Sequence, residues 1–157
     1  MSVDVWPYKL TKMSDWGNGW EYLSPELLER TDSLVTIARE VSNDPSVKLN
    51  INVAYATQGH LADSMHYKGL AFDGYLYGLK SEGQLPLMTQ LFCALKAGFR
   101  GVGIYPEWLT PGIHCDVRPL AENECVHTWV RRGGSYLYID ENELKMISTQ
   151  LLGGING

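Results

Sequence analysis

Two polar stretches that lie far apart in the chain place the strongest constraint on the fold. Residues 64–73 carry His66 and Asp73, seven residues apart, and residues 112–118 carry His114. Histidine nitrogens and carboxylate oxygens are common zinc ligands, and a hydrolytic zinc site needs three such ligands and one open position. His66, Asp73 and His114 are therefore candidate ligands of one Zn²⁺ ion per chain, if the fold brings them together.

The strand pattern around these residues explains how one sheet can present all three groups. Residues 113–118 alternate apolar and polar side chains, which predicts a strand whose polar front carries His114 and Asp116. Residues 70–76 predict a second strand, with Asp73 on one of its faces. We expect the two fronts to point toward the same place.

The rest of the pattern predicts an α+β fold, with a single domain over residues 1–157. Its sheet should be small and mainly antiparallel, with the helices packed to one side. Apolar residues at helical spacing predict helices over 25–41 and 85–97. Further elements are expected as strands over 47–53, 101–105 and 135–139 and as a C-terminal helix over 141–152.

Composition narrows the classes of partner. The formal net charge is −5, which argues against non-specific binding to nucleic acid and against docking on anionic lipid. Hydrophobic residues make up 45% of the chain, yet no run approaches the ~18 apolar residues of a membrane span. Residues 1–16 lack the apolar region of a signal peptide. We expect a monomer that is made in the cytoplasm and binds neither nucleic acid nor membrane.

The two polar stretches resemble the motifs of a known family. Residues 64–73 fit the pattern Ser-x-His-x-x-Gly-x-Ala-x-Asp at all five fixed positions, and residues 101–106 with 113–118 are similar to the closing motif. This is the signature of the D-alanyl-D-alanine carboxypeptidase-like zinc peptidases, and the resemblance covers about residues 22–118. The family includes carboxypeptidases, D,D-dipeptidases and phage endolysins that cut the L-alanyl-D-glutamate bond. Its metal site is similar to that of the hedgehog signalling domain.

The resemblance implies a function as well as ligands. It implies that His66, Asp73 and His114 hold the zinc, and that the substrate is a peptidoglycan stem peptide. On this interpretation the chain is a phage endolysin or a bacterial wall-remodelling enzyme, which reaches the cell wall after release from the cytoplasm. Zinc lowers the pKa of a bound water to about 7, so that a nucleophile exists at neutral pH.

The resemblance leaves the catalytic base open. Relatives use a glutamate, aspartate or histidine upstream of the last ligand, and Glu107 lies seven residues before His114. Asp116 is the competing candidate, and its other interpretation is a carboxylate that orients a ligand or pairs with Arg118. We favour Glu107 as the base. Ser64 and Arg118 are expected to contact the substrate, although Ser64 also fits a hydrogen bond beside the first ligand or a plain turn serine.

One departure from the family bears on the type of cleavage. Many relatives have an arginine where this chain has Ala56, and that arginine can bind a substrate carboxylate. Its absence favours an endopeptidase over a carboxypeptidase, unless Arg118 or Lys68 substitutes. The alternatives to an enzyme are a non-catalytic zinc-binding module and a metal-free domain on the same scaffold. His60 and His127 are expected to be ordinary surface or hydrogen-bonded histidines.

Overall fold

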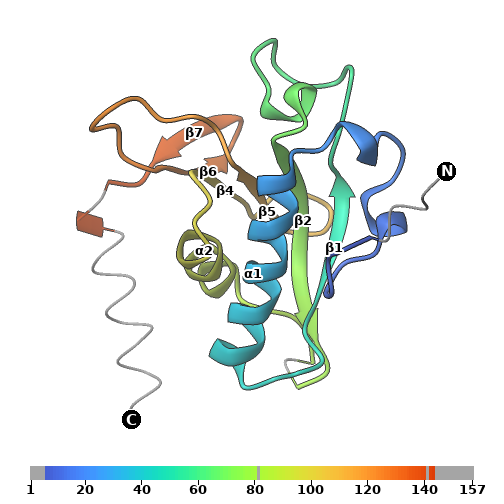
Figure 1. The fold of residues 1–157 in the computed structure, drawn as a ribbon. Helices are drawn as coiled ribbons and strands as arrows, with labels where there is room; N and C mark the ends of the chain where they lie inside the picture. Colours follow the sequence, from blue (N-terminus) through green and yellow to red (C-terminus); the bar gives the residue numbers. More distant parts are fainter. Residues whose placement is uncertain (1–5, 81, 141, 144–157) are drawn as a thin grey trace, which may run out of the picture.

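The computed structural model describes residues 6–80, 82–140 and 142–143 (Figure 1). Two α-helices and a seven-stranded mixed sheet make up this part of the chain, so the predicted α+β class is confirmed. Apart from residues 142–143, the predicted helix over 141–152 lies outside the described residues. Within the described ranges, no helix combines the length and the apolar character needed to cross a membrane.

The sheet has the strand order β1-β2-β5-β4-β6-β7, with the short strand β3 paired to β2. Every pairing is antiparallel except that of β4 with β6. Strand β6 lies in a segment for which the sequence predicted no element. The bounds are α1 Pro25–Ser42, α2 Leu87–Lys96, β1 Lys48–Val53, β2 Ala71–Gly78, β3 Gly83–Gln84, β4 Gly101–Tyr105, β5 Gly112–Asp116, β6 His127–Arg132 and β7 Ser135–Tyr138, with 3₁₀ turns at Met13–Trp16, Trp20–Tyr22 and Met65–Lys68.

Helix α1 begins and ends at residues suited to those positions. Pro25 occupies the first turn, where its missing N–H costs nothing, and Asn43 ends the helix in the left-handed region at φ 48°. Its apolar stripe, which includes Leu27 and Leu34, is fully buried. Helices α1 and α2 pack against each other on one side of the sheet (Figure 1), as predicted.

The two faces of the sheet differ because side chains alternate along its strands. Phe72 on β2 is fully buried on the helix side, where its ring makes edge contacts with Trp16 and Phe99 at centroid distances of 6.0 and 5.8 Å. Burying a side chain of this size contributes roughly 1.5–3 kcal/mol to folding. The next residue, Asp73, faces the other way. The helices therefore fill one face of the sheet and leave the opposite face for polar chemistry.

An ion pair connects α1 to the far end of β5. The guanidinium of Arg100 donates hydrogen bonds to both carboxylate oxygens of Glu26, at 2.5 and 3.0 Å, and also to the carbonyl oxygens of Val117 and Arg118. The Arg100 backbone N–H donates to the carbonyl of Asp116 at 2.9 Å. This arginine therefore fixes the last residue of β5 and the two residues that follow it.

Replacing Glu26 with glutamine is expected to lower the free energy of unfolding by about 0.5–1 kcal/mol at pH 7, because the pair is partly exposed. The Arg100 hydrogen bonds hold the pKa of Glu26 below its ordinary value. Its contribution is therefore complete above the unfolded-state pKa of about 4.3 and is lost as the pH falls through the folded-state value. Urea unfolding at pH 7 and pH 3 should show the difference shrink at pH 3, whereas an equal difference would contradict this.

Candidate metal centre

Strand pairing brings the two polar stretches together. In the antiparallel pairing of β2 with β5, Asp73 lies directly opposite His114, and Ala71 lies opposite Asp116. Directly opposite residues have side chains on the same face and within contact distance. The prediction that these strands present their polar groups on a common face is therefore confirmed.

The 3₁₀ turn at Met65–Lys68 delivers the first histidine. Ser64 stands at its N-cap, and its hydroxyl accepts a hydrogen bond from the backbone N–H of His66 at 3.3 Å. Gly69 ends the turn at φ 67°, and a Cβ there would collide with the backbone carbonyl of Tyr22. Only glycine fits at this end of the turn, from which the chain continues into β2. The turn places His66 in a buried position beside β2. Ser64 thus caps the turn that carries the first histidine, and its bond lies beside the proposed ligand.

The ring of His66 is oriented by a backbone carbonyl. Its Nδ1 lies 2.7 Å from the carbonyl oxygen of Ala54, and since a carbonyl only accepts, Nδ1 carries the proton. The other nitrogen, Nε2, is buried without a hydrogen-bond partner and lies 3.2 Å from Asp73 Oδ1. Two donors each about 2.1 Å from a tetrahedral zinc lie about 3.4 Å apart. The 3.2 Å between His66 Nε2 and Asp73 Oδ1 is close to this spacing, so one cation could bind both atoms.

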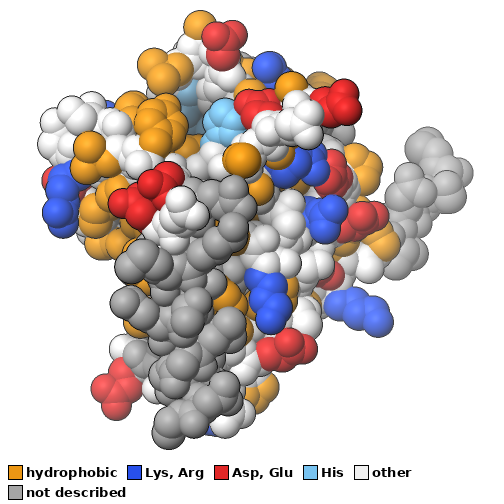
Figure 2. Space-filling view, turned by 90° about the vertical axis from the view of Figure 1, so that its left-hand side faces the viewer, with side chains coloured by type: hydrophobic (Ala, Val, Ile, Leu, Met, Phe, Trp, Pro, Cys, Tyr) orange, Lys and Arg blue, Asp and Glu red, His pale blue; other side chains and the backbone are white. Residues whose placement is uncertain are grey.

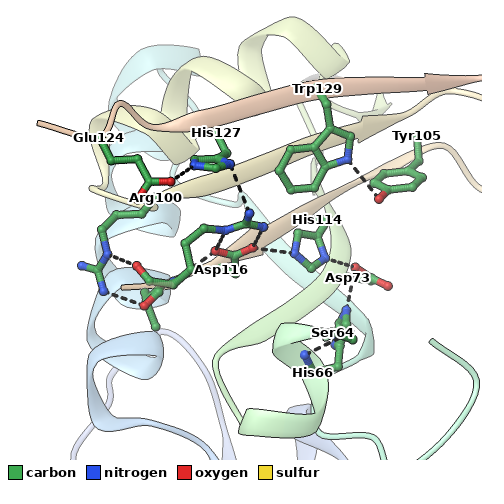
Figure 3. A network of polar contacts seen from close by, with 12 residues as sticks. Ser64, His66, Asp73, Arg100, Tyr105, His114, Asp116, Glu124, His127 and Trp129 are labelled. Carbon is green, nitrogen blue, oxygen red and sulfur yellow. Dashed lines mark hydrogen bonds and ion pairs between the residues drawn. The ribbon is translucent and has the colours of Figure 1, made fainter. Parts of the chain in front are cut away.

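His114 lies between two carboxylates (Figure 3). Its Nδ1 is 2.8 Å from Asp73 Oδ1, and its Nε2 is 2.9 Å from Asp116 Oδ2. Burial alone would lower the pKa of His114, but the hydrogen bonds to Asp116 and Asp73 raise it to about 9. Burial would likewise raise the pKa of Asp73, but the hydrogen bond with His114 and the proximity of His66 hold it below its ordinary value. Both histidines therefore converge on a single oxygen of an ionised Asp73.

Asp116 is buried and its carboxylate is fully engaged. Besides His114, it accepts hydrogen bonds from the Arg118 backbone N–H and Nε on Oδ1, at 3.1 and 2.8 Å, and from Arg118 Nη2 on Oδ2. A carboxylate that holds the second nitrogen of a metal-binding histidine fixes the orientation of that ring. The geometry fits this role for Asp116. It also neutralises Arg118, which reduces what that arginine can offer to a substrate.

The glycines of β4 make room for this arrangement. Gly103 lies opposite His114, and a Cβ at Gly103 would overlap the indole ring of Trp129. Gly101 lies opposite Asp116, and a Cβ there would collide with its carboxylate. Steric exclusion of a side chain therefore explains both glycines of the Gly101-Val102-Gly103 run. The run clears the polar face of β4, so that groups from β5 and β6 can lie across it.

The histidines and Asp73 lie in an open cleft of about 830 Å³. Figure 2 shows histidine side chains reaching the surface of the molecule near hydrophobic side chains. The cleft is polar where β2 and β5 contribute and largely aromatic along β4, β6 and β7. The described residues that line it are Gly59, His60, Leu61, Asp63, Ser64, Met65, His66, Asp73, Tyr105, Trp108, His114, Arg118, Trp129, Arg131, Tyr136 and Tyr138.

Glu107, the base favoured from the sequence, is not among the described residues that line this cleft. Its side chain is exposed, and its carboxylate accepts a hydrogen bond from the backbone N–H of Gly133 at 2.9 Å. Lys68 is likewise not among the lining residues. In the arrangement described, Glu107 attaches the loop after β4 to the turn between β6 and β7. Its role as base stays a prediction that no contact in the structure supports.

His60, which the sequence indicated to be an ordinary surface or hydrogen-bonded histidine, lies beside the proposed ligands. Its ring stacks on that of His66 at a centroid distance of 4.3 Å, and one ligand atom from each of His60, His66 and Asp73 lies within 4.8 Å of the others. Tyr67 holds this position, because its hydroxyl bonds both the N–H and the carbonyl of His60 at 2.9 Å. His60 and Asp63 thus join the groups in the cleft that can bind a metal or accept a proton.

The comparisons with known proteins add no family. No protein-family model matches the chain, and no curated protein matches it. The resemblance to zinc peptidases therefore stays a prediction, carried by the motifs and by the geometry of the residues within them.

Proposed function

We propose that this protein is a zinc-dependent peptidase that hydrolyses an amide bond in peptidoglycan stem peptides. One observation carries the proposal. Asp73 Oδ1 lies 2.8 Å from His114 Nδ1 and 3.2 Å from the unpartnered Nε2 of His66, at the surface of an open cleft. Two imidazoles and one carboxylate are one of the ligand sets found in hydrolytic zinc sites.

Three groups of residues have different roles in the proposed reaction. His66, Asp73 and His114 hold the metal, and zinc bound there supplies a nucleophile at neutral pH and polarises the substrate carbonyl. Asp116, fixed by Arg118, holds the ring of His114 so that Nδ1 faces Asp73, and these two groups with His66 would hold the metal. The aromatic side chains along β4, β6 and β7 bury apolar parts of a peptide and exclude water around the bond.

The type of cleavage follows from the charges near the metal. The backbone N–H of Ala56 donates to the carbonyl of His66 at 3.4 Å, so position 56, where many members of the resembled family have an arginine, lies beside the first proposed ligand. Alanine removes that cation, and a buried carboxylate without a partner is costly. Cleavage inside the stem peptide is accordingly favoured over removal of its last residue.

A non-catalytic zinc module is the second candidate, and the position of His60 favours it. If His60 joined His66, Asp73 and His114, the metal would have four protein ligands, which is the closed set of structural zinc sites. In an enzyme, His60 must not bind the metal, so that one coordination position stays open for water. The two candidates therefore differ in ligand number and in whether peptide bonds are cut.

Purified sacculi separate the two candidates. The zinc-loaded protein should release new amine termini from sacculi, identified by mass spectrometry, and removal of the metal by a chelator should abolish the release. Readdition of zinc should restore it. A protein that binds one zinc per chain and leaves the sacculi intact would exclude the peptidase and support the structural module.

A further inference from the structure

One cation faces the cleft without an acidic partner. Arg131 lines the cleft and is exposed, and no described carboxylate forms an ion pair with it. Arg118 is the other cation of the lining, and Asp116 already neutralises its charge. Arg131 is therefore the positive charge that the described cleft can offer to a ligand.

The register of the β6–β7 hairpin decides where Arg131 points. Side chains alternate along β6, so Arg131 shares the cleft face with Trp129, whereas Arg132 is not among the lining residues. Arg131 lies opposite Tyr136 on β7, and its guanidinium carbon is 5.7 Å from the centre of that ring. The attraction between cation and ring holds the guanidinium in place while its N–H groups stay available to a second partner.

The β6–β7 hairpin is anchored to the end of β4 and to the loop that follows it. Its turn donates a hydrogen bond from Gly133 to Glu107, and Trp129 Nε1 donates to the Tyr105 hydroxyl at 3.1 Å. Strand β6 also pairs in parallel with β4. A cation that is positioned before binding loses less conformational freedom when a ligand arrives.

We propose that Arg131 binds a carboxylate of the substrate and selects peptides that carry a free acid near the bond to be cut. The inference takes its substrate class, the stem peptide, from the proposed function. A guanidinium pairs with a carboxylate through two parallel hydrogen bonds, which fixes orientation as well as position.

Stem peptides offer two such acids, the α-carboxylate of the γ-linked D-glutamate and the C-terminal carboxylate. Four synthetic versions of L-Ala-γ-D-Glu-L-Lys-D-Ala-D-Ala distinguish them, with either acid, both or neither converted to the amide. Because Trp108 and Trp129 line the cleft, quenching of tryptophan fluorescence reports binding without any need for hydrolysis. Each peptide is titrated into the wild-type protein, Arg131→Gln and the matched control Arg132→Gln, and hydrolysis is followed in parallel.

The wild-type protein should bind one of the free-acid forms at least about tenfold more tightly than its amide. Arg131→Gln should remove this preference, and Arg132→Gln should keep it. A wild-type protein without preference, or without binding, would overturn the inference, as would a preference that survives Arg131→Gln. Binding that depends on Arg131 but leads to no hydrolysis would instead reject the proposed function and leave the carboxylate site standing.

Discussion

Replacing His66 with alanine is expected to abolish stoichiometric zinc binding and peptide hydrolysis together. The substitution removes the buried Nε2 that lies 3.2 Å from Asp73 Oδ1 and leaves two of the three proposed ligands. Loss of one protein ligand should weaken zinc binding by more than about a hundredfold, since even loss of a residue that only orients a ligand costs 10- to 100-fold. Metal analysis after dialysis, combined with a competing chelator, measures the effect.

Two further variants make this result specific. Asp73→Asn keeps the shape of the side chain and removes its charge, so it should also lose the metal. His127→Ala should keep it, because the Nε2 of His127 bonds Glu124 at 2.7 Å and the residue does not line the cleft in the described structure. Circular dichroism of each variant checks that the fold is intact. One zinc per chain with unchanged affinity in a folded His66→Ala protein would remove His66 from the ligands.

Asp116→Asn is expected to lower zinc affinity by 10- to 100-fold, because the amide holds the Nε2 of His114 more weakly than a carboxylate does. The substitution also leaves the guanidinium of Arg118 without its ionised partner. Glu124→Gln is the control, since that carboxylate lies at the exposed end of the same row of polar contacts (Figure 3). An Asp116→Asn protein that binds zinc normally and loses only turnover would make Asp116 the base.

Glu107→Gln tests the other candidate for the base. Glutamine can still accept the hydrogen bond from Gly133, so the hairpin stays attached, and we expect zinc binding and most of the turnover to be retained. Glu107→Ala removes the attachment as well and should mainly raise KM. General bases contribute typically 10²- to 10⁴-fold to the rate. A loss of that size in Glu107→Gln, with zinc retained, would support the role that the sequence favours for Glu107.

Local alternation was enough to predict the polar floor of the cleft. Period-two patterning placed His114 with Asp116 on one face, and the observed register puts Asp73 opposite His114. Because strand period is a property of adjacent residues, it can be seen in a single sequence. The glycine pattern of β4 was also visible, but its reason was not, since the colliding groups come from β5 and β6.

The walls of the cleft depend on contacts between distant residues. Strand β6 is positioned by its parallel pairing with β4, and no local sequence pattern predicts that pairing. The position of His60 is set by the hydroxyl of Tyr67 rather than by its own neighbours in the chain. Arg131 lies beyond residues 22–118, which the family resemblance covers, so the motifs do not predict a role for it. These three features could be identified only from the three-dimensional structure.

The division of the sheet has a consequence for how such a protein can diversify. The proposed metal ligands come from β2, β5 and the turn before β2, whereas Arg131 and Tyr136 stand on a hairpin joined at the end of the sheet. Substitutions in the hairpin can therefore alter which peptide is preferred while the metal ligands stay in register. Grafting other hairpins next to β4, with the order β1-β2-β5-β4 kept unchanged, would be a rational way to search for new cleavage preferences.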